Sequence, residues 1–123
     1  MKKVIVIDDE LVNRKLTESY LIELGYLEKD ILLFNNGKEF ISEMDKLKED
    51  EINYILLDIY MPEVNGMEVI DKLKISHLKD VPIIVITTDD KIKDKVAPLV
   101  SSFNVRPISF MDFVKVISNY IRE

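Results

Sequence analysis

Four short apolar runs and a briefer fifth, separated by longer amphipathic stretches, form the pattern of this chain. Each run is bounded by polar or turn-forming residues, which is typical of a strand that is buried on both faces of a parallel sheet. The predicted strands are residues 4–7, 31–34, 54–57, 83–86 and 103–105.

Between these runs, apolar residues recur at the three- and four-residue spacing of a helix with one buried face. Gly25 is expected to end the first helix, Pro98 to break or kink the fourth, and Ser109 with Asp112 to form a capping box at the start of the last. The predicted apolar stripes are Leu16, Tyr20, Leu21 and Leu24; Phe40, Ile41, Met44 and Leu47; Met67, Ile70 and Leu73; Ile92, Val96 and Leu99; and Phe110, Phe113, Val114, Ile117 and Ile121.

The alternation of five strands with five helices predicts an α/β sandwich built on a parallel sheet. Crossovers between parallel strands are right-handed, and helices on both faces favour the doubly wound, flavodoxin-like (βα)5 topology with a five-stranded parallel sheet. We expect residues 1–123 to form a single domain with no output domain, because no linker, repeat or low-complexity segment is present.

The composition restricts the function classes. Hydrophobic residues make up 47% of the chain and charged residues 33%, as in an ordinary globular domain. The net charge of −6 argues against direct nucleic-acid binding. The chain has no cysteine, which excludes disulfides and thiolate metal sites and fits a reducing compartment. No apolar stretch approaches a membrane span, so no membrane insertion is expected and the cytoplasm is the predicted location.

Acidic residues follow two of the predicted strands. Asp8 and Asp9 follow the first and Asp58 follows the third, and these strand ends are neighbours at the switch point of such a sheet. Each like-charged pair at about 4 Å costs roughly 4 kcal/mol at an effective dielectric near 20, so a proton or a cation is needed. Oxygen ligands favour Mg²⁺ or Mn²⁺, with the backbone carbonyl of Tyr60 as a further ligand. Glu10 is a weaker candidate, because the helix dipole already explains an acid there.

A metal beside a carboxylate allows phosphoryl transfer onto that carboxylate, with Asp58 attacking in line. Thr87, after the fourth strand, offers a hydroxyl, and Arg106, after the fifth, offers a positive charge. Each residue also has a simpler interpretation: a turn cap for Asp58, a helix N-cap for Thr87 and a solvated charge for Arg106. The joint pattern, with one group at the end of each strand, favours the chemical interpretation.

Four motifs in this order resemble the response regulator receiver domain, of the type found in CheY, over essentially the whole chain. They are VIVIDDE with Asp8-Asp9, LLDIYMPEVNG with Asp58, Met61-Pro62 and Gly66, PIIVITT with Thr87, and the basic residue before proline at Arg106-Pro107. The resemblance implies that Asp58 accepts a phosphoryl group from a histidine kinase or a histidine phosphotransfer protein. It implies Mg²⁺ bound by Asp9 directly and by Asp8 through water.

The resemblance also implies how phosphorylation is transmitted to a downstream protein target. Thr87 would bind the phosphoryl group and move with it, and Phe103 would turn inward. The peptide bond between Arg106 and Pro107 is predicted to be cis. At most, such a domain catalyses its own phosphotransfer and dephosphorylation, so it is not expected to be a conventional enzyme.

Several positions depart from the family pattern. Arg106 stands where the family has lysine, and it is expected either to bridge Asp58 or a phosphoryl oxygen, or to point elsewhere. The segment of the fourth helix is short and contains Pro98, Ser101-Ser102 replaces an Ala-Gly-Ala turn, and Thr88 replaces a smaller residue. These changes leave a second hypothesis open, a degenerate receiver that binds a partner independently of phosphate.

Two enzyme classes are less consistent with the sequence. A haloacid-dehalogenase-type phosphatase needs a second aspartate where Tyr60 stands, and a flavodoxin-type phosphate loop is incompatible with the acids at residues 8–10. His77, the only histidine, is expected to have a surface or capping role. The cluster Lys91, Lys93 and Lys95 is expected to be a solvated face.

Overall fold

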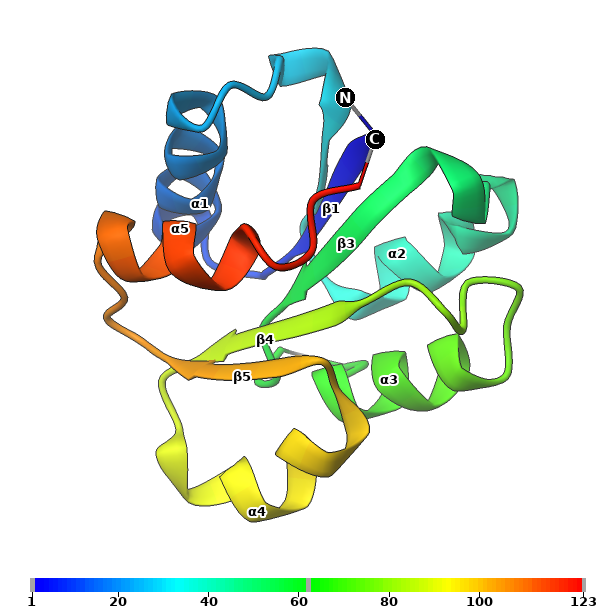
Figure 1. Cartoon of the computed structure of the whole chain (residues 1–123). Coiled ribbons are helices and arrows are strands. Elements are labelled where there is room, and N and C mark those ends of the chain that lie inside the picture. The colour runs from blue at the N-terminus through cyan, green and yellow to red at the C-terminus, as the bar shows by residue number, and fades with distance from the viewer. Residues whose placement is uncertain (1, 62, 123) are drawn as a thin grey trace.

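Five parallel strands form a single sheet in the computed structural model, which describes residues 2–61 and 63–122 (Figure 1). The strand order is β2-β1-β3-β4-β5, so the chain reverses direction across the sheet after β2, as in the predicted doubly wound topology. The strands are β1 (Lys3–Ile7), β2 (Ile31–Phe34), β3 (Ile52–Leu57), β4 (Ile83–Thr87) and β5 (Ser102–Val105).

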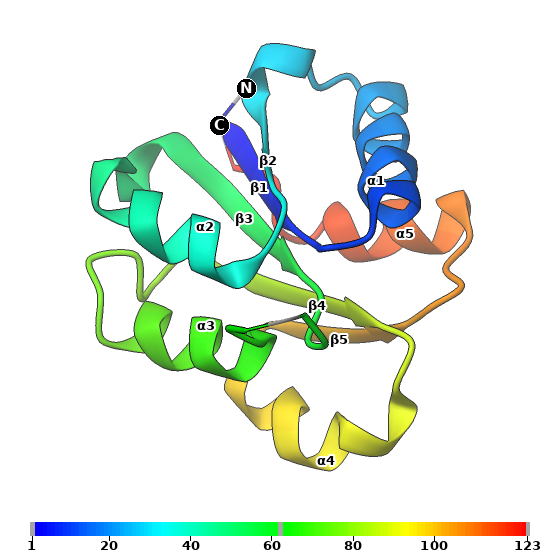
Figure 2. The same ribbon diagram turned by 180° about the vertical axis from the view of Figure 1, so that it is seen from behind.

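Helices cover both faces of this sheet. Figures 1 and 2 show α1 and α5 on one face and α2 and α3 on the other, with α4 beside β5. The α-helices are α1 (Leu11–Glu23), α2 (Gly37–Glu43), α3 (Gly66–Lys74), α4 (Lys93–Val96) and α5 (Phe110–Ile117). Short 3-10 turns are η1 (Glu28–Asp30), η2 (Met44–Lys46), η3 (Glu49–Glu51), η4 (Asp90–Ile92) and η5 (Ala97–Leu99). Among the described residues, no helix has the length and apolar character needed to span a bilayer.

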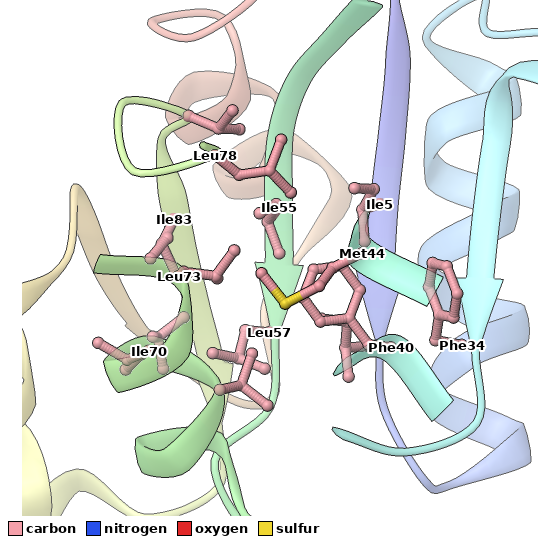
Figure 3. Close-up of a cluster of buried hydrophobic side chains, with 14 of the residues drawn as sticks. Ile5, Phe34, Phe40, Met44, Ile55, Leu57, Ile70, Leu73, Leu78 and Ile83 are labelled. Atoms are coloured by element: carbon pink, nitrogen blue, oxygen red, sulfur yellow. The ribbon is translucent and has the colours of Figure 1, made fainter. Parts of the chain in front are cut away.

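Two apolar clusters lie on opposite faces of the sheet, because successive side chains of a strand point to opposite sides. Along β1, Ile5 and Ile7 enter the cluster beneath α2 and α3, whereas Val4 and Val6 enter the cluster beneath α1 and α5. Figure 3 shows the first cluster, in which side chains from α2 and α3 meet those of the strands. The central strands are buried along nearly their whole length, as their apolar runs predicted.

The predicted stripe of α1 is wrong at one position. Leu16 is 43% exposed, and the side chains that α1 buries are Thr17 and Leu21. These two residues are four apart and share a face, so the helix is turned to place them against the sheet. Because Thr17 is polar, a search for apolar periodicity passes over it.

Six stripe residues lie outside the α-helices: Leu24, Met44, Leu47, Ile92, Leu99 and Ile121. Leu47 follows η2, because α2 ends at Glu43, yet it still packs against the core. Leu99 belongs to η5 and is 36% exposed, so its predicted inward position is wrong, because the chain has left the helical repeat there. Ile121 follows the end of α5, where it packs on the second cluster. Pro98 lies at the start of η5, which fits its predicted effect on the end of the fourth helix.

Polar side chains cap the N-termini of three of the described helices, α2, α3 and α5. Asn36 and Asn65 each accept a hydrogen bond from the backbone N–H three residues later, at the starts of α2 and α3. Ser109 does the same for Asp112 at the start of α5. The prediction that Gly25 stops the first helix is confirmed: α1 ends at Glu23, and Gly25 follows two residues later with a φ of 107°, in the left-handed region.

Candidate functional site

The carboxyl ends of four neighbouring strands deliver the candidate residues to one edge of the sheet. Ile7 pairs with Leu57, so the residues that follow them, Asp8 and Asp58, leave adjacent strands side by side. Thr87 is the last residue of β4, and Arg106 directly follows β5. The topology therefore brings together the groups that the sequence scattered over about a hundred residues.

Three carboxylates meet at this edge. One carboxylate oxygen from each of Asp8, Asp9 and Asp58 lies within 4.8 Å of the others. Asp8 is 1% exposed and Asp58 is 9% exposed, whereas Asp9 is more open to solvent. Glu10 does not join this cluster; its backbone N–H donates to Asp8 Oδ1 at 3.0 Å, and its side chain accepts a hydrogen bond from Asn13.

Burial makes ionisation of two of these carboxyls unfavourable. Loss of solvent raises the pKa of Asp8 to about 6, and the charge of Asp58 adds to the effect, while the Glu10 N–H and Arg106 oppose it. Burial also raises the pKa of Asp58, against hydrogen bonds from the loop and the charge of Arg106. The pocket thus holds more negative charge than its surroundings compensate. An all-oxygen donor set with this surplus fits Mg²⁺.

The loop after β3 folds tightly back on Asp58. The Ile59 N–H donates to Asp58 Oδ1 at 2.7 Å, and the Gly66 N–H donates to the Ile59 carbonyl at 2.7 Å. A Cβ at Gly66 would lie only 2.7 Å from the Asp58 carbonyl oxygen and 2.6 Å from the Ile59 Cα, so this position requires glycine. Met61 is buried, whereas Pro62 of the same motif lies outside the described residues.

Arg106 reaches past Asp58 to the more distant acid. Its Nη2 donates to Asp8 Oδ2 at 2.8 Å, and its side chain is only 11% exposed. The orientation is therefore neither a bridge to Asp58 nor a solvated charge. The length of the guanidinium side chain explains this, since β5 and β1 are separated by two strands. The Arg106–Pro107 peptide bond is cis.

Thr87 is not the N-cap of the helical turn that follows β4. Thr87 is fully buried, and its Oγ1 accepts a 3.4 Å hydrogen bond from the Asp89 N–H. Asp89 itself caps η4, by accepting from the Lys91 N–H at 2.8 Å. The Thr87 hydroxyl thus keeps its own proton for a further acceptor. Phe103 is half-buried and packs against the cluster beneath α2 and α3.

Two contacts at the site were not predicted from the sequence. The Tyr60 hydroxyl donates to Asp89 Oδ2 at 2.7 Å, which raises the pKa of Tyr60 and lowers that of Asp89. Arg14 Nη1 donates to the backbone carbonyl of Asp8 at 2.9 Å. An arginine one turn inside the first helix was the only available signal for the second contact, and nothing in the sequence marked the first.

The remaining candidates lie apart from the acids. His77 Nε2 is 2.6 Å from the Leu47 carbonyl oxygen, so the exposed histidine connects the turn after α3 to the segment before η3, in keeping with its predicted surface role. Lys91, Lys93 and Lys95 are all exposed.

Comparison with known proteins gives matches over most of the chain. The family described as "Response regulator receiver domain" matches residues 4–104. The chain is 30% identical to the chemotaxis protein CheY1 of Helicobacter pylori (strain ATCC 700392 / 26695), over 87% of this chain and 86% of that protein. It is 27% identical to the transcriptional regulatory protein PcoR of Escherichia coli over 99% of this chain, and it spans 52% of PcoR.

Solved structures show the same fold. The response regulator TrrA of Thermotoga maritima, in complex with Mg(2+)-BeF, superimposes with a TM-score of 0.85 at 25% identity, over 98% of this chain and 100% of that chain. The chemotaxis protein CheY4 of Vibrio cholerae gives a TM-score of 0.83 at 22% identity, over 98% of this chain and 99% of that chain.

Proposed function

We propose that Asp58 is the phospho-acceptor of this chain, which belongs to the response regulator receiver domain family and takes part in two-component signal transduction. One observation carries the assignment. Asp58 lies nearly buried at the end of a central strand, within 4.8 Å of two further carboxylates. A turn cap at the end of a strand needs only one carboxylate. A site where a cation assists phosphoryl transfer needs several carboxylates close together, as found here.

Asp8, Asp9 and Asp58, with the carbonyl of Tyr60, are the proposed ligands of Mg²⁺, and Mn²⁺ has the same ligand preference. The bound cation would neutralise charge that develops on the phosphoryl oxygens. The solved complex of TrrA with Mg(2+)-BeF supports this choice, because it has the same fold at 25% identity.

The residues of the pocket have separable tasks in this proposal. The Ile59 N–H holds Asp58 Oδ1, which leaves the other carboxylate oxygen as the nucleophile. That oxygen attacks the phosphorus of a phosphohistidine, the P–N bond breaks, and an acyl phosphate forms on Asp58 while the histidine nitrogen leaves with the bonding pair. The Thr87 hydroxyl donates a hydrogen bond to a phosphoryl oxygen, and Arg106 supplies a positive charge.

The donor is proposed to be a sensor histidine kinase or a histidine phosphotransfer protein, and the output a protein target. Thr87 and Phe103 are the proposed switch residues, because one sits at the site and the other packs beside it on the adjacent strand β5. The cytoplasm remains the predicted location. A phosphorylation-independent interaction module is the less favoured alternative, since the three carboxylates that are proposed to bind the cation lie within 4.8 Å of one another.

Intact-mass analysis after incubation with acetyl phosphate and Mg²⁺ tests the proposal. The native chain should gain one phosphoryl group, and the matched variant Asp58→Asn should gain none. A native chain that forms no adduct, under conditions in which a control receiver is phosphorylated, would contradict the assignment.

A further inference from the structure

The two carboxylate oxygens of Asp8 are both engaged. Oδ1 accepts the Glu10 N–H at 3.0 Å, and Oδ2 accepts Nη2 of Arg106 at 2.8 Å. Asp8 and the Arg106 side chain are both largely buried, so water screens their attraction only weakly. The pair is the one ion pair between buried side chains in the described part of the chain.

A divalent cation and Arg106 require the same carboxylate. Asp8 belongs to the cluster whose donor set fits Mg²⁺, and Oδ2 is the oxygen that the backbone does not hold. A cation at this cluster and a guanidinium on the same carboxylate are like charges in a poorly hydrated pocket, so they repel each other. Occupation by one therefore disfavours the other.

The guanidinium is held incompletely and has room to move. Its Nε is buried without a hydrogen-bond partner among the described residues, so the contact with Asp8 leaves part of the donor fork unsatisfied. Arg106 also lines a neighbouring cavity of about 400 Å³, together with Glu10, Asn13 and Thr88. The side chain thus stands between the acidic pocket and a space that contains another carboxylate and polar groups.

We propose that Arg106 is a displaceable counter-ion, which holds Asp8 in the metal-free protein and is released from Asp8 when a divalent cation binds the three carboxylates. The inference rests on the proposed function, because it concerns the same metal site. Release also frees the guanidinium group to contact a phosphoryl oxygen on Asp58. The cation therefore has to bind before Arg106 can make that contact. Arg106 is then a positioning residue that links the two events.

Arginine side-chain NMR tests this directly, since the chain has only three arginines: Arg14, Arg106 and Arg122. In metal-free protein labelled with ¹⁵N-arginine, the guanidinium signals of Arg106 should show the restricted motion of a group that is paired with Asp8. Titration with Mg²⁺ should change these signals with the same midpoint as the backbone amide of Asp9. Arg122, which donates to the Ile52 carbonyl, is the internal reference and should not change. Arg106 signals that are unaltered at saturating Mg²⁺, or an absence of Mg²⁺ binding, would overturn the inference.

A double-mutant cycle separates displacement from a general charge effect. Arg106→Gln should tighten Mg²⁺ binding by about tenfold in the native background, the equivalent of one charge-assisted hydrogen bond. In the Asp8→Asn background, the same change should alter the affinity by less than about twofold, because the contested carboxylate is gone. Equal effects in both backgrounds would show that Arg106 acts only through space, which rejects displacement.

The matched control is Arg14→Lys. Arg14 contacts the carbonyl of Asp8 and not its carboxylate, so this variant should retain the native Mg²⁺ affinity. The metal titrations are independent of phosphorylation. If Mg²⁺ releases Arg106 but no phosphoryl adduct forms, only the assignment of Asp58 as phospho-acceptor is rejected. If an adduct forms while Arg106 stays on Asp8, only the displacement of Arg106 is rejected.

Discussion

The Tyr60 hydroxyl donates a 2.7 Å hydrogen bond to the Asp89 carboxylate, and so joins the loop after β3 to the loop after β4. These loops follow Asp58 and Thr87, the two groups that are proposed to contact the phosphoryl group. Asp89 also donates its backbone N–H to the Thr87 hydroxyl. Through Asp89, the hydrogen bond therefore connects Tyr60, at the entrance of the site, to Thr87, which is proposed to bind the phosphoryl group.

Loss of this bridge should shorten the lifetime of the phosphorylated protein. Tyr60→Phe removes the hydrogen bond but keeps the ring, and we expect hydrolysis of the acyl phosphate to become about two- to fivefold faster, as befits one exposed hydrogen bond. The decay of the phosphorylated mass after removal of the phosphodonor measures this rate. Asp89→Asn keeps an acceptor oxygen and should decay at nearly the native rate; a Tyr60→Phe variant that is no faster than native would exclude the bridge as a control of lifetime.

Neutralising Asp58 should stabilise the metal-free protein. Burial raises the pKa of Asp58, so its charged form is disfavoured in the folded state at neutral pH. Asp58→Asn keeps the acceptor for the Ile59 N–H and removes the charge, and the free energy of unfolding should rise by roughly 1 kcal/mol. Urea unfolding at pH 7.5 with a chelator measures this. A less stable variant would show that the negative charges of the pocket are fully compensated.

Asp8 gives the protein a pH dependence of defined sign. Its pKa is about 6 in the folded chain against an ordinary value of 3.8, so the folded state binds the proton more tightly than the unfolded state. The contribution of Asp8 to stability is therefore present at low pH and is lost as pH rises from about 4 through about 6. Mg²⁺ competes with this proton, so its affinity should fall as pH drops below about 6.

Urea unfolding between about pH 4.5 and about pH 7.5, on either side of the pKa of Asp8, measures this dependence. Because other carboxyls also titrate, the relevant quantity is the difference between the native chain and Asp8→Asn. That difference should favour the native chain more at the acidic end. A difference that is independent of pH would contradict the raised pKa.

Gly66→Ala should damage the site as well as the fold. The added Cβ would approach the Asp58 carbonyl oxygen at 2.7 Å, which forces the Asp58 loop to shift, and we expect a loss of about 1–3 kcal/mol of stability. Mg²⁺ affinity and phosphorylation rate should both fall. Gly37→Ala is the matched comparison, because its Cβ would meet the Val64 carbonyl at the same 2.7 Å, and its nearest neighbours belong to Val64 and Val69 rather than to Asp58 or Ile59. Equal loss of Mg²⁺ affinity in both variants would indicate a general rather than a local effect.

The amino-acid sequence by itself determined the architecture and indicated which residues form the candidate site. Buried strands can be identified from apolar runs such as residues 83–86, because a strand covered on both faces tolerates few polar side chains. Once the sheet is parallel, the residues that follow its strands must meet at one edge, and so Asp8, Asp58 and Thr87 could be grouped without coordinates. Helix faces were harder to predict where a polar residue such as Thr17 replaces an apolar one.

Only the tertiary structure decided how these side chains pair. The sequence placed Arg106 near the acids, but which carboxylate it binds depends on the separation of β5 from β1 and on the reach of the guanidinium. The bond from Tyr60 to Asp89 likewise depends on two loops that are adjacent only in space. Periodicity reports which face of an element is buried, whereas a hydrogen bond between distant residues is set by distances that arise only when the elements pack.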